Sequence, residues 1–376
     1  EDDIIKILFA ENPGIVIQVK DKHKEEVKKI LEDAGIGYVK LGKPTEERHI
    51  LVEKGDATYQ FGIDYLRDVW YSTSYLLDRK QSMNGCAKKR FENYKKQPLE
   101  FVFDKSFTGK LSQFGLNPDR RTPTGIKAAI IREKGTNGER EMAYMLYLAG
   151  FDVKDVTMTD LVSGRETLED INFIVFCGGF SNSDVLGSAK GWAGAFLFNP
   201  KAKAALDNFY ARKDTLSLGV CNGCQLMIEL NLINPDFTKK AKMLHNDSHK
   251  FESKFVGVTV PMNRSVMFGS LSGSKLGIWV AHGEGKFSLP YHEDKYNVVL
   301  KYSYDEYPGN PNGSDYSVAG LASPDGRHLA MMPHLERSCF PWQNAYYPAD
   351  RIKNDQITPW MEAFVNARKW IEMNKK

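Results

Sequence analysis

Two cysteines three residues apart, Cys221 and Cys224, lie in the stretch GVCNGCQLM. Such a pair could bind zinc, form a redox couple, or combine one reactive thiol with a bystander. Zinc needs further ligands, and the sequence offers no second ligand pair at a comparable spacing. We therefore interpret Cys224 as a small buried residue and expect no metal site.

The residues around Cys221 favour a nucleophile. An apolar strand, then Gly-x-Cys-x-Gly, then a helix is the cysteine version of the nucleophile elbow. Gly219 and Gly223 leave room for the tight turn that lifts the sulfur from the sheet edge. The N-terminus of the following helix favours the thiolate, which is the reactive form of cysteine.

A cysteine nucleophile needs a base and a group that orients it. His334, in MMPHLER, follows an apolar strand at the position where α/β sheets place their chemistry. Glu336 is two residues further on and can accept a hydrogen bond from Nδ1, which leaves Nε2 to face the sulfur of Cys221. We therefore expect these three residues to form a triad.

An oxyanion that forms during attack needs backbone donors close by. The buried strand in VFCGGFSNS ends at two glycines, and the second, Gly179, can turn its amide into the cleft. The amide of Asn222 directly follows the nucleophile. We expect these two residues to form the oxyanion hole.

The elements that would position these groups begin at Ile126. From there to residue 376, apolar strands alternate with helices, which predicts an α/β domain with a mostly parallel sheet flanked by helices. The segment SVAGLASPDGRHLAMMPH reads as two strands around a Pro-Asp-Gly turn. The chain ends on a predicted helix within ITPWMEAFVNARKWIEM.

The preceding residues are organised differently. Residues 1–78 predict a small α+β segment with strands at Gly14–Val19, Tyr38–Leu41 and His49–Glu53, and with helices at His23–Gly35 and Phe61–Leu77. So short a segment makes a thin core, and we expect it to rest on something else. Residues 79–125 are polar, basic and rich in turn residues, and we interpret them as a linker lying on a surface.

Composition narrows the function classes. The chain has 376 residues and a net charge of +3, which gives no reason to expect nucleic acid or an anionic membrane as a partner. No apolar run approaches the ~20 residues of a membrane-spanning helix. Five scattered cysteines argue against a disulfide framework and favour a cytoplasmic location.

The motifs together resemble a known family. GVCNGCQ, the GGF turn and PHLER are similar to the class I (triad) glutamine amidotransferases. GGFSNSDVLGSAKGWA, HGEGKF and PWMEAFVNARKW narrow the resemblance to the glutaminase domain of large-form phosphoribosylformylglycinamidine synthases, over residues 126–376. LFAENPGIVIQV and LRDVWYSTSYLL resemble the end of the synthetase region. The sequence starts at Glu1, and we expect a C-terminal piece of a longer chain.

The resemblance implies roles for further residues. Gln225 matches a position that helps to hold the substrate glutamine. A second set is expected, less specifically, to line the pocket: Phe180, Ser181, His282 and Gly283. His282 and Glu284 could be mistaken for a metal pair, but two ligands make a poor site.

Two departures from the family pattern stand out. Leu335 replaces the proline expected between the histidine and the glutamate, which makes that turn less rigid. Asn182 and Ser183 stand where Tyr-Gly is usual, so the loop there has lost a glycine.

The resemblance implies hydrolysis of glutamine through a glutamyl thioester, with no cofactor for the glutaminase domain. The ammonia would serve a synthetase domain of the parent chain, which would use ATP and Mg²⁺ to convert formylglycinamide ribonucleotide to the amidine. Three alternatives stay open: another class I amidotransferase or thiol hydrolase, a glutamine-binding module without turnover, and a redox or metal protein that uses Cys221 and Cys224.

Overall fold

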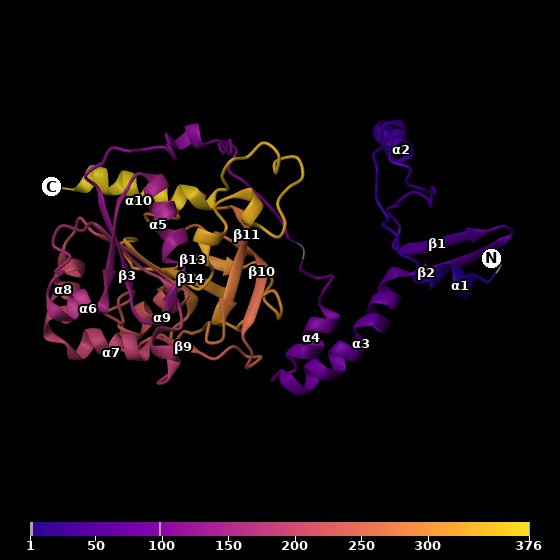
Figure 1. The fold of residues 1–376 in the computed structure, drawn as a ribbon. Coiled ribbons are helices and arrows are strands. Elements are labelled where there is room, and N and C mark those ends of the chain that lie inside the picture. Colours follow the sequence, from indigo (N-terminus) through magenta and orange to yellow (C-terminus); the bar gives the residue numbers. More distant parts are fainter. Residues whose placement is uncertain (1–2, 98, 376) are drawn as a thin grey trace. The chain divides into compact units, whose positions relative to one another are not determined.

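The computed structural model describes residues 3–97 and 99–375 and divides the chain into two compact units. The first unit ends at Arg67 and the second begins at Asp68. Figure 1 shows the ribbon of both, coloured along the sequence. Because the boundary falls within a helix, the predicted domain limits at residues 78 and 125 stay a prediction.

The first unit has little internal packing. It holds two helices, α1 (Ile4–Leu8) and α2 (Lys24–Asp33), and an antiparallel hairpin of β1 (His49–Lys54) and β2 (Ala57–Gly62). Between Asp3 and Arg67, no described residue is buried. The thin core that the sequence predicted is therefore confirmed.

Two strands predicted for this unit are wrong. Gly14–Val19 and Tyr38–Leu41 have apolar sequences but an irregular backbone. A strand forms only when its backbone groups find a ladder partner, and apolar composition does not supply one. The predicted strand at His49 has that partner, because Gly55 turns the chain back with φ +57°.

Residues 68–125 belong to the second unit. Helix α3 (Ile63–Gln81) continues into it, and α4 (Cys86–Glu92) follows. Cys86 and Phe107 are buried, so the predicted linker is packed at these points. Asp78, at the end of α3, accepts hydrogen bonds from Lys250 at 2.9 Å and from Arg90 at 2.5 Å.

The second unit is built on a nine-stranded mixed sheet. Five neighbouring strands run parallel: β5 (Asp152–Thr157), β3 (Lys127–Arg132), β6 (Phe173–Phe176), β8 (Leu216–Val220) and β15 (His328–Met331). The sheet continues through antiparallel pairs: β14 (Val318–Ala322), β13 (Asn297–Tyr302), β10 (Glu252–Thr259) and β11 (Lys275–His282). The predicted α/β class is confirmed, and only one half of the sheet is parallel.

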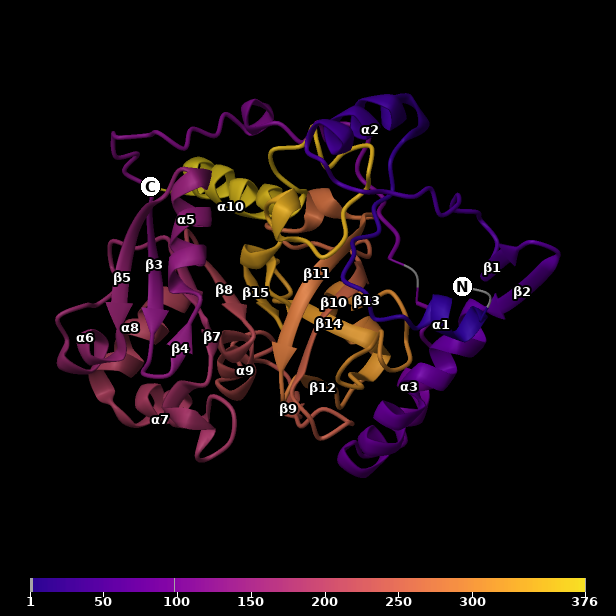
Figure 2. The ribbon, with the colours of Figure 1, turned by 45° about the vertical axis from the view of Figure 1, so that its right-hand side comes forward.

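Helices flank this sheet, as Figure 2 shows from a second side. Helix α5 (Glu139–Ala149) packs against α10 (Trp360–Asn374). A second group packs together, with α7 against α8 and α9 and with α6 against α8: α6 (Met158–Ser163), α7 (Lys190–Phe198), α8 (Pro200–Ala211) and α9 (Asn222–Glu229). The layers bury a large apolar core that includes Trp192 and Trp360.

The three central parallel strands position the predicted chemistry. In the sheet β8 lies between β6 and β15, and all three run in the same direction. Gly178 follows β6, Cys221 follows β8, and His334 comes shortly after β15. The carboxyl ends of parallel strands share one edge of the sheet, so the fold brings these residues together.

No helix in residues 3–97 or 99–375 is long and apolar enough to cross a membrane.

Candidate active site

Cys221 stands on a strained turn. It lies between β8 and α9 with φ +52° and ψ −106°, a backbone conformation that side chains rarely adopt. The flanking glycines are required by space. A Cβ on Gly219 would lie 2.5 Å from the Gly223 carbonyl oxygen, and a Cβ on Gly223 would lie 2.0 Å from that of Phe176. The strand–turn–helix geometry predicted around Cys221 is therefore present, and its role as the nucleophile stays a prediction.

His334 and Glu336 lie beside this elbow. Glu336 Oε1 accepts a hydrogen bond from His334 Nδ1 at 2.7 Å, and both side chains are about 2% exposed. A Cβ placed on Gly178 would lie 2.9 Å from His334 Cε1 and 3.4 Å from Cys221 Cβ. The imidazole and the cysteine therefore meet over Gly178, where any larger residue would separate them.

The turn between His334 and Glu336 is held in place, although Leu335 replaces the expected proline. This leucine is fully buried and starts a short 3-10 helix, Leu335–Arg337. The backbone N–H of His334 donates to the Trp279 carbonyl at 2.8 Å. Packing and the neighbouring strand thus hold the turn, and the leucine leaves the His334–Glu336 hydrogen bond in place.

The charge of His334 is set by its neighbours. Burial alone would lower the pKa of this imidazole, but the Glu336 carboxylate and the Cys221 sulfur raise the pKa to about 10. His334 Nε2 has no hydrogen-bond partner among the described residues. A protonated Nε2 close to the sulfur is what protonation of a leaving group requires.

The predicted oxyanion donors come from two segments, α9 and the short strand β7 (Gly178–Gly179). Asn222 is the first residue of α9, where an amide N–H has no intrahelical acceptor. Gly179 has φ +121° and pairs with Thr136 in a short antiparallel ladder. A side chain at Gly179 would lie 2.6 Å from the Gly135 carbonyl oxygen, so glycine is needed for this approach.

A chain of hydrogen bonds joins the segments around the elbow. The Ser181 N–H donates to Asn222 Oδ1 at 3.1 Å, and Asn222 Nδ2 donates to Gln225 Oε1 at 2.9 Å. Gln225 Nε2 then donates to the Glu284 carbonyl at 2.8 Å. Gln225 therefore positions two walls of the site, in addition to the substrate contact expected of it.

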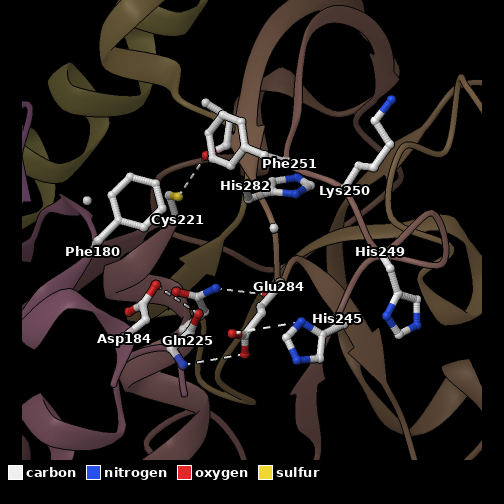
Figure 3. A pocket seen from close by; sticks show the side chains of 14 residues that line it. Phe180, Asp184, Cys221, Gln225, His245, His249, Lys250, Phe251, His282 and Glu284 are labelled. Atoms are coloured by element: carbon white, nitrogen blue, oxygen red, sulfur yellow. Dashed lines mark hydrogen bonds and ion pairs between the residues drawn. The ribbon is translucent and has the colours of Figure 1, made fainter. Parts of the chain in front are cut away.

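A cavity of about 200 Å³ opens above Cys221, as Figure 3 shows. This volume is below the range for drug-sized ligands and suits a small metabolite. Most of the residues expected in the pocket line it: Gly179, Phe180, Gln225, His282 and Gly283. Ser181 is not among the lining residues; it is 1% exposed and supports the wall through its N–H.

His282 is a second buried histidine at this cavity, and its tautomer follows from Asn246. Asn246 Nδ2 donates to the Lys250 and His282 carbonyls, so its Oδ1 faces the ring. His282 Nδ1 lies 3.2 Å from that oxygen and must carry the proton. Burial, and then the charge of His334, lower the pKa of His282 to about 3. The ring is neutral, and its Nε2 is a bare acceptor.

Sequence reasoning missed Asp184 and undervalued Glu284. Both line the cavity, together with a wall made of His245, His249, Lys250 and Phe251. Asp184 follows the GGF turn in a segment that looked like an ordinary polar loop. The missing glycine at position 183 was a usable signal, because it marked this loop as unusual.

The structure gives no support to a redox or metal-binding role for Cys224. Cys224 is fully buried in α9, and burial raises the pKa of its thiol well above the usual value. No group of three or more metal-ligating side chains occurs in the part of the chain that the structure describes.

Comparison with known proteins gives a consistent result. The chain is 38% identical over 403 residues to phosphoribosylformylglycinamidine synthase from Homo sapiens, and 37% identical over 396 residues to the probable chloroplastic or mitochondrial enzyme of Arabidopsis thaliana. Each match covers 98% of this chain, but only 29% and 27% of those proteins. The chain thus spans less than a third of the length of these relatives, and the resemblance seen in the sequence is confirmed.

A solved structure is also similar to this chain. The structure titled PurLQS from Thermotoga maritima matches with a TM-score of 0.50 and 27% identity, over 67% of this chain and 99% of that one. A family model described as the CobB/CobQ-like glutamine amidotransferase domain matches residues 125–371. This match covers most of the second unit, including Cys221, His334 and Glu336. The chain therefore belongs to the CobB/CobQ-like glutamine amidotransferase family.

Proposed function

We propose that this chain hydrolyses the side-chain amide of glutamine with Cys221 as nucleophile, His334 as acid and base, and Glu336 as the residue that orients His334. One observation carries the proposal. The His334 imidazole is hydrogen-bonded to Glu336 at 2.7 Å and meets Cys221 over Gly178. Family membership supports the same reaction class.

In the first half of the reaction, the Cys221 thiolate attacks the amide carbon, and the C=O electron pair moves onto oxygen. The backbone amides of Gly179 and Asn222 stabilise this oxyanion. The oxyanion then collapses and breaks the C–N bond, and His334 Nε2 gives its proton to the departing nitrogen. Ammonia leaves, and a γ-glutamyl thioester remains on Cys221.

In the second half, neutral His334 takes a proton from a water molecule that attacks the thioester carbon. Collapse of the second oxyanion breaks the C–S bond and returns the thiolate beside a protonated His334. Glutamic acid leaves and ionises. Glu336 keeps its charge throughout and holds Nδ1, which leaves Nε2 to move each proton.

We further propose that the ammonia serves a carbon–nitrogen ligase that makes formylglycinamidine ribonucleotide, as the names of the relatives suggest. Synthetase domains, ATP and Mg²⁺ would belong to the remaining part of such an enzyme, and a cytoplasmic location stays a prediction. Ammonia in bulk water is protonated and loses its nucleophilicity, so we expect a route shielded from solvent. In the complete enzyme, Cys221→Ala should abolish glutamine-dependent synthesis and spare synthesis from added ammonium.

The glutaminase itself is tested by trapping. A glutamine-like diazoketone, 6-diazo-5-oxo-L-norleucine, should add one covalent group to Cys221, located by peptide mass spectrometry, and Cys221→Ala should remain unmodified. Cys224→Ala is the matched control, and its labelling should be unchanged. Undiminished labelling of Cys221→Ala would overturn the assignment. Release of glutamate from glutamine, compared with esters and peptides, separates an amidotransferase from a general thiol hydrolase and from a binding module.

A further inference from the structure

One side of the cavity is formed by a loop between two strands of different sheets. The strand β9 (Lys242–Leu244) precedes it, and β10 follows it. We call residues 245–251 the wall loop, because four of them line the cavity of Cys221: His245, His249, Lys250 and Phe251. His249 has φ +52°, a left-handed conformation that is unfavourable for a residue other than glycine. The loop therefore needs contacts with other parts of the protein to keep this shape.

Two hydrogen bonds connect the wall loop to the turn between α3 and α4. The Met83 N–H donates to the Ser248 carbonyl at 3.0 Å. Asn84 Nδ2 donates to the Asp247 carbonyl at 2.9 Å. Cys86, at the start of α4, is 2% exposed, so this helix packs into the second unit. The turn therefore anchors the middle of the wall loop, although the two segments are more than 160 residues apart.

Asp78, a buried carboxylate near the end of α3, holds the side chain of Lys250. The Lys250 ammonium points away from Cys221 in Figure 3 and donates to Asp78 Oδ1 at 2.9 Å. The Ser82 hydroxyl donates to the same oxygen at 2.6 Å, and Arg90 donates to Asp78 Oδ2 at 2.5 Å. Burial at 6% exposure would raise the pKa of Asp78, but these three donors lower it. Asp78 is therefore ionised at neutral pH.

Glu252, the first residue of β10, completes the charged cluster. Its carboxylate is 2% exposed and lies 2.6 Å from Lys254 Nζ and 3.6 Å from Arg90 Nη2. Arg90 and Lys254 would thus keep a carboxylate partner if Asp78 were neutral. Lys250 differs, because Asp78 is its ion-pair partner among residues 3–97 and 99–375. The position of Lys250 therefore depends on Asp78.

We propose that Asp78 is a positioning residue for the glutaminase: through Lys250 it holds the wall loop in the place where the loop lines the cavity. Without the charge of Asp78, three cations would share one carboxylate, and Lys250 would turn to solvent and release its end of the loop. The family match begins at residue 125, so Asp78 lies upstream of the matched part. The inference rests on the proposed glutaminase activity and extends its machinery to a segment outside that match.

The test compares the Asp78→Asn variant with the unchanged 376-residue chain. We expect KM for glutamine to rise about tenfold, the value of one charge-assisted hydrogen bond, and kcat to change less, because the reacting groups are untouched. Lys250→Met should also raise KM, and the double variant should be no worse than Lys250→Met alone, because both changes break the same contact. Steady-state glutamate release measures all three. Multiplicative losses in the double variant would overturn the proposal.

Loss of a partner from a buried ion pair lowers stability in any role, so a second measurement reports on the loop itself. In NMR spectra of the histidine ring protons, the signals of His245 and His249 should shift in the Asp78→Asn variant. The signals of His292, which lies outside the cavity, should not shift. A variant that unfolds at lower urea concentration but keeps its KM and both wall-loop signals would mean that Asp78 only supports folding, and would overturn the proposal.

A milder variant and a matched control complete the test. Asn84→Ala removes one hydrogen bond to the wall loop from an exposed side chain and should raise KM about threefold. Glu92→Gln removes an exposed carboxylate of α4 that pairs with Lys88 at 3.8 Å, and it should leave KM unchanged. Equal KM values for Asp78→Asn, Asn84→Ala and the unchanged chain contradict this inference alone. An unchanged chain that hydrolyses no glutamine and whose Cys221 resists the diazoketone contradicts the proposed function itself.

Discussion

Two histidines of the second unit are equally buried, but one imidazole is charged and the other is neutral. His334 and His282 are each about 2% exposed. His334 has a carboxylate, Glu336, on its Nδ1, and its pKa is raised to about 10. His282 has a carboxamide, Asn246, in the same place, and its pKa is lowered to about 3. Burial lowers the pKa in both cases, and the Glu336 carboxylate together with the Cys221 sulfur keeps the proton on His334, whereas His282 has no such neighbour and is lowered further by the charge of His334.

Because their charges differ, the two histidines are suited to different roles. A charged His334 can give a proton to a leaving group, whereas Nε2 of a neutral His282 can only accept a hydrogen bond. The second role suits His282, because this residue lines the cavity. The predictions below test this contrast by exchanging the properties of the two rings.

The largest effect is expected from removing each imidazole in turn. His334→Gln should lower kcat for glutamine by ~10⁴-fold, because proton transfer to the nitrogen and from water is lost. His282→Gln should cost about tenfold and mainly raise KM, because one hydrogen bond is lost. Glutamate release under steady-state conditions measures both. Similar losses of kcat in the two variants would contradict the division of roles.

A second variant gives His334 the kind of partner that His282 has. Glu336→Gln replaces the carboxylate by a carboxamide, so the pKa of His334 should fall from about 10. We expect glutamine turnover to fall by about a hundredfold or more, as for other triads that lose this carboxylate. The pH dependence of Cys221 alkylation by iodoacetamide should show a new transition nearer neutral pH. An unchanged profile would mean that Glu336 does not set the charge of His334.

The reverse exchange is Asn246→Asp. A carboxylate on Nδ1 should raise the pKa of His282 from about 3 by ~1–3 units, which an NMR titration of the ring protons would measure. The variant should also lose ~1–3 kcal/mol of stability, because Asp cannot donate to the Lys250 and His282 carbonyls. Asn246→Ala also loses these donors without adding a charge, and its His282 pKa should stay low.

The smallest expected effect is on the pH dependence of the free energy of unfolding. The folded-state pKa of His282 lies below its unfolded value, so its contribution is present above about pH 6.5 and is lost as the pH falls toward 3. At pH 5 the loss amounts to about 2 kcal/mol. His334 has the opposite sign: its contribution is complete below about pH 6.5 and is lost as the pH rises through about 10.

Urea unfolding of the His282→Phe variant measures the contribution of His282 to the free energy of unfolding. The difference in free energy of unfolding between the variant and the unchanged chain should shift by about 2 kcal/mol in favour of the variant from pH 8 to pH 5. The reason is that the variant lacks the buried ring that resists protonation. The exposed His292→Gln is the matched control for loss of an imidazole. A gain of equal size in both variants, or no gain in His282→Phe, would contradict a neutral His282.

Local rules made the arrangement of Cys221, His334 and Glu336 predictable from sequence. Gly219 and Gly223 are needed because a side chain would meet backbone within 2.5 Å, and such a steric demand is visible in the residue types. Glu336 could be matched to His334 because two residues of separation bring the side chains together. The hairpin of β14 and β15 around the Pro-Asp-Gly turn was predicted and is confirmed. The pairing of the other antiparallel strands was not predicted, and Gly14–Val19 was predicted wrongly, because such pairing depends on partners distant in sequence.

The pocket wall was less predictable for the same reason. Asp184 and Glu284 are a hundred residues apart, and each looks like an ordinary polar loop residue until Ser188 and Gln225 join them. The tautomer of His282 likewise depends on Asn246, 36 residues away. Contacts of this kind are visible only in the folded protein, whereas the Gly-x-Cys-x-Gly pattern can be read from five consecutive residues.

The hydrogen-bond chain from Ser181 through Asn222 and Gln225 to Glu284 also bears on how this pocket can diverge. Each member forms a hydrogen bond with the next, so replacing Asn222 or Gln225 alone leaves buried partners unmatched and is expected to lower stability. We expect these positions to be inherited as a block and to covary among relatives. Libraries aimed at new amide substrates should therefore randomise them jointly and leave Cys221 fixed.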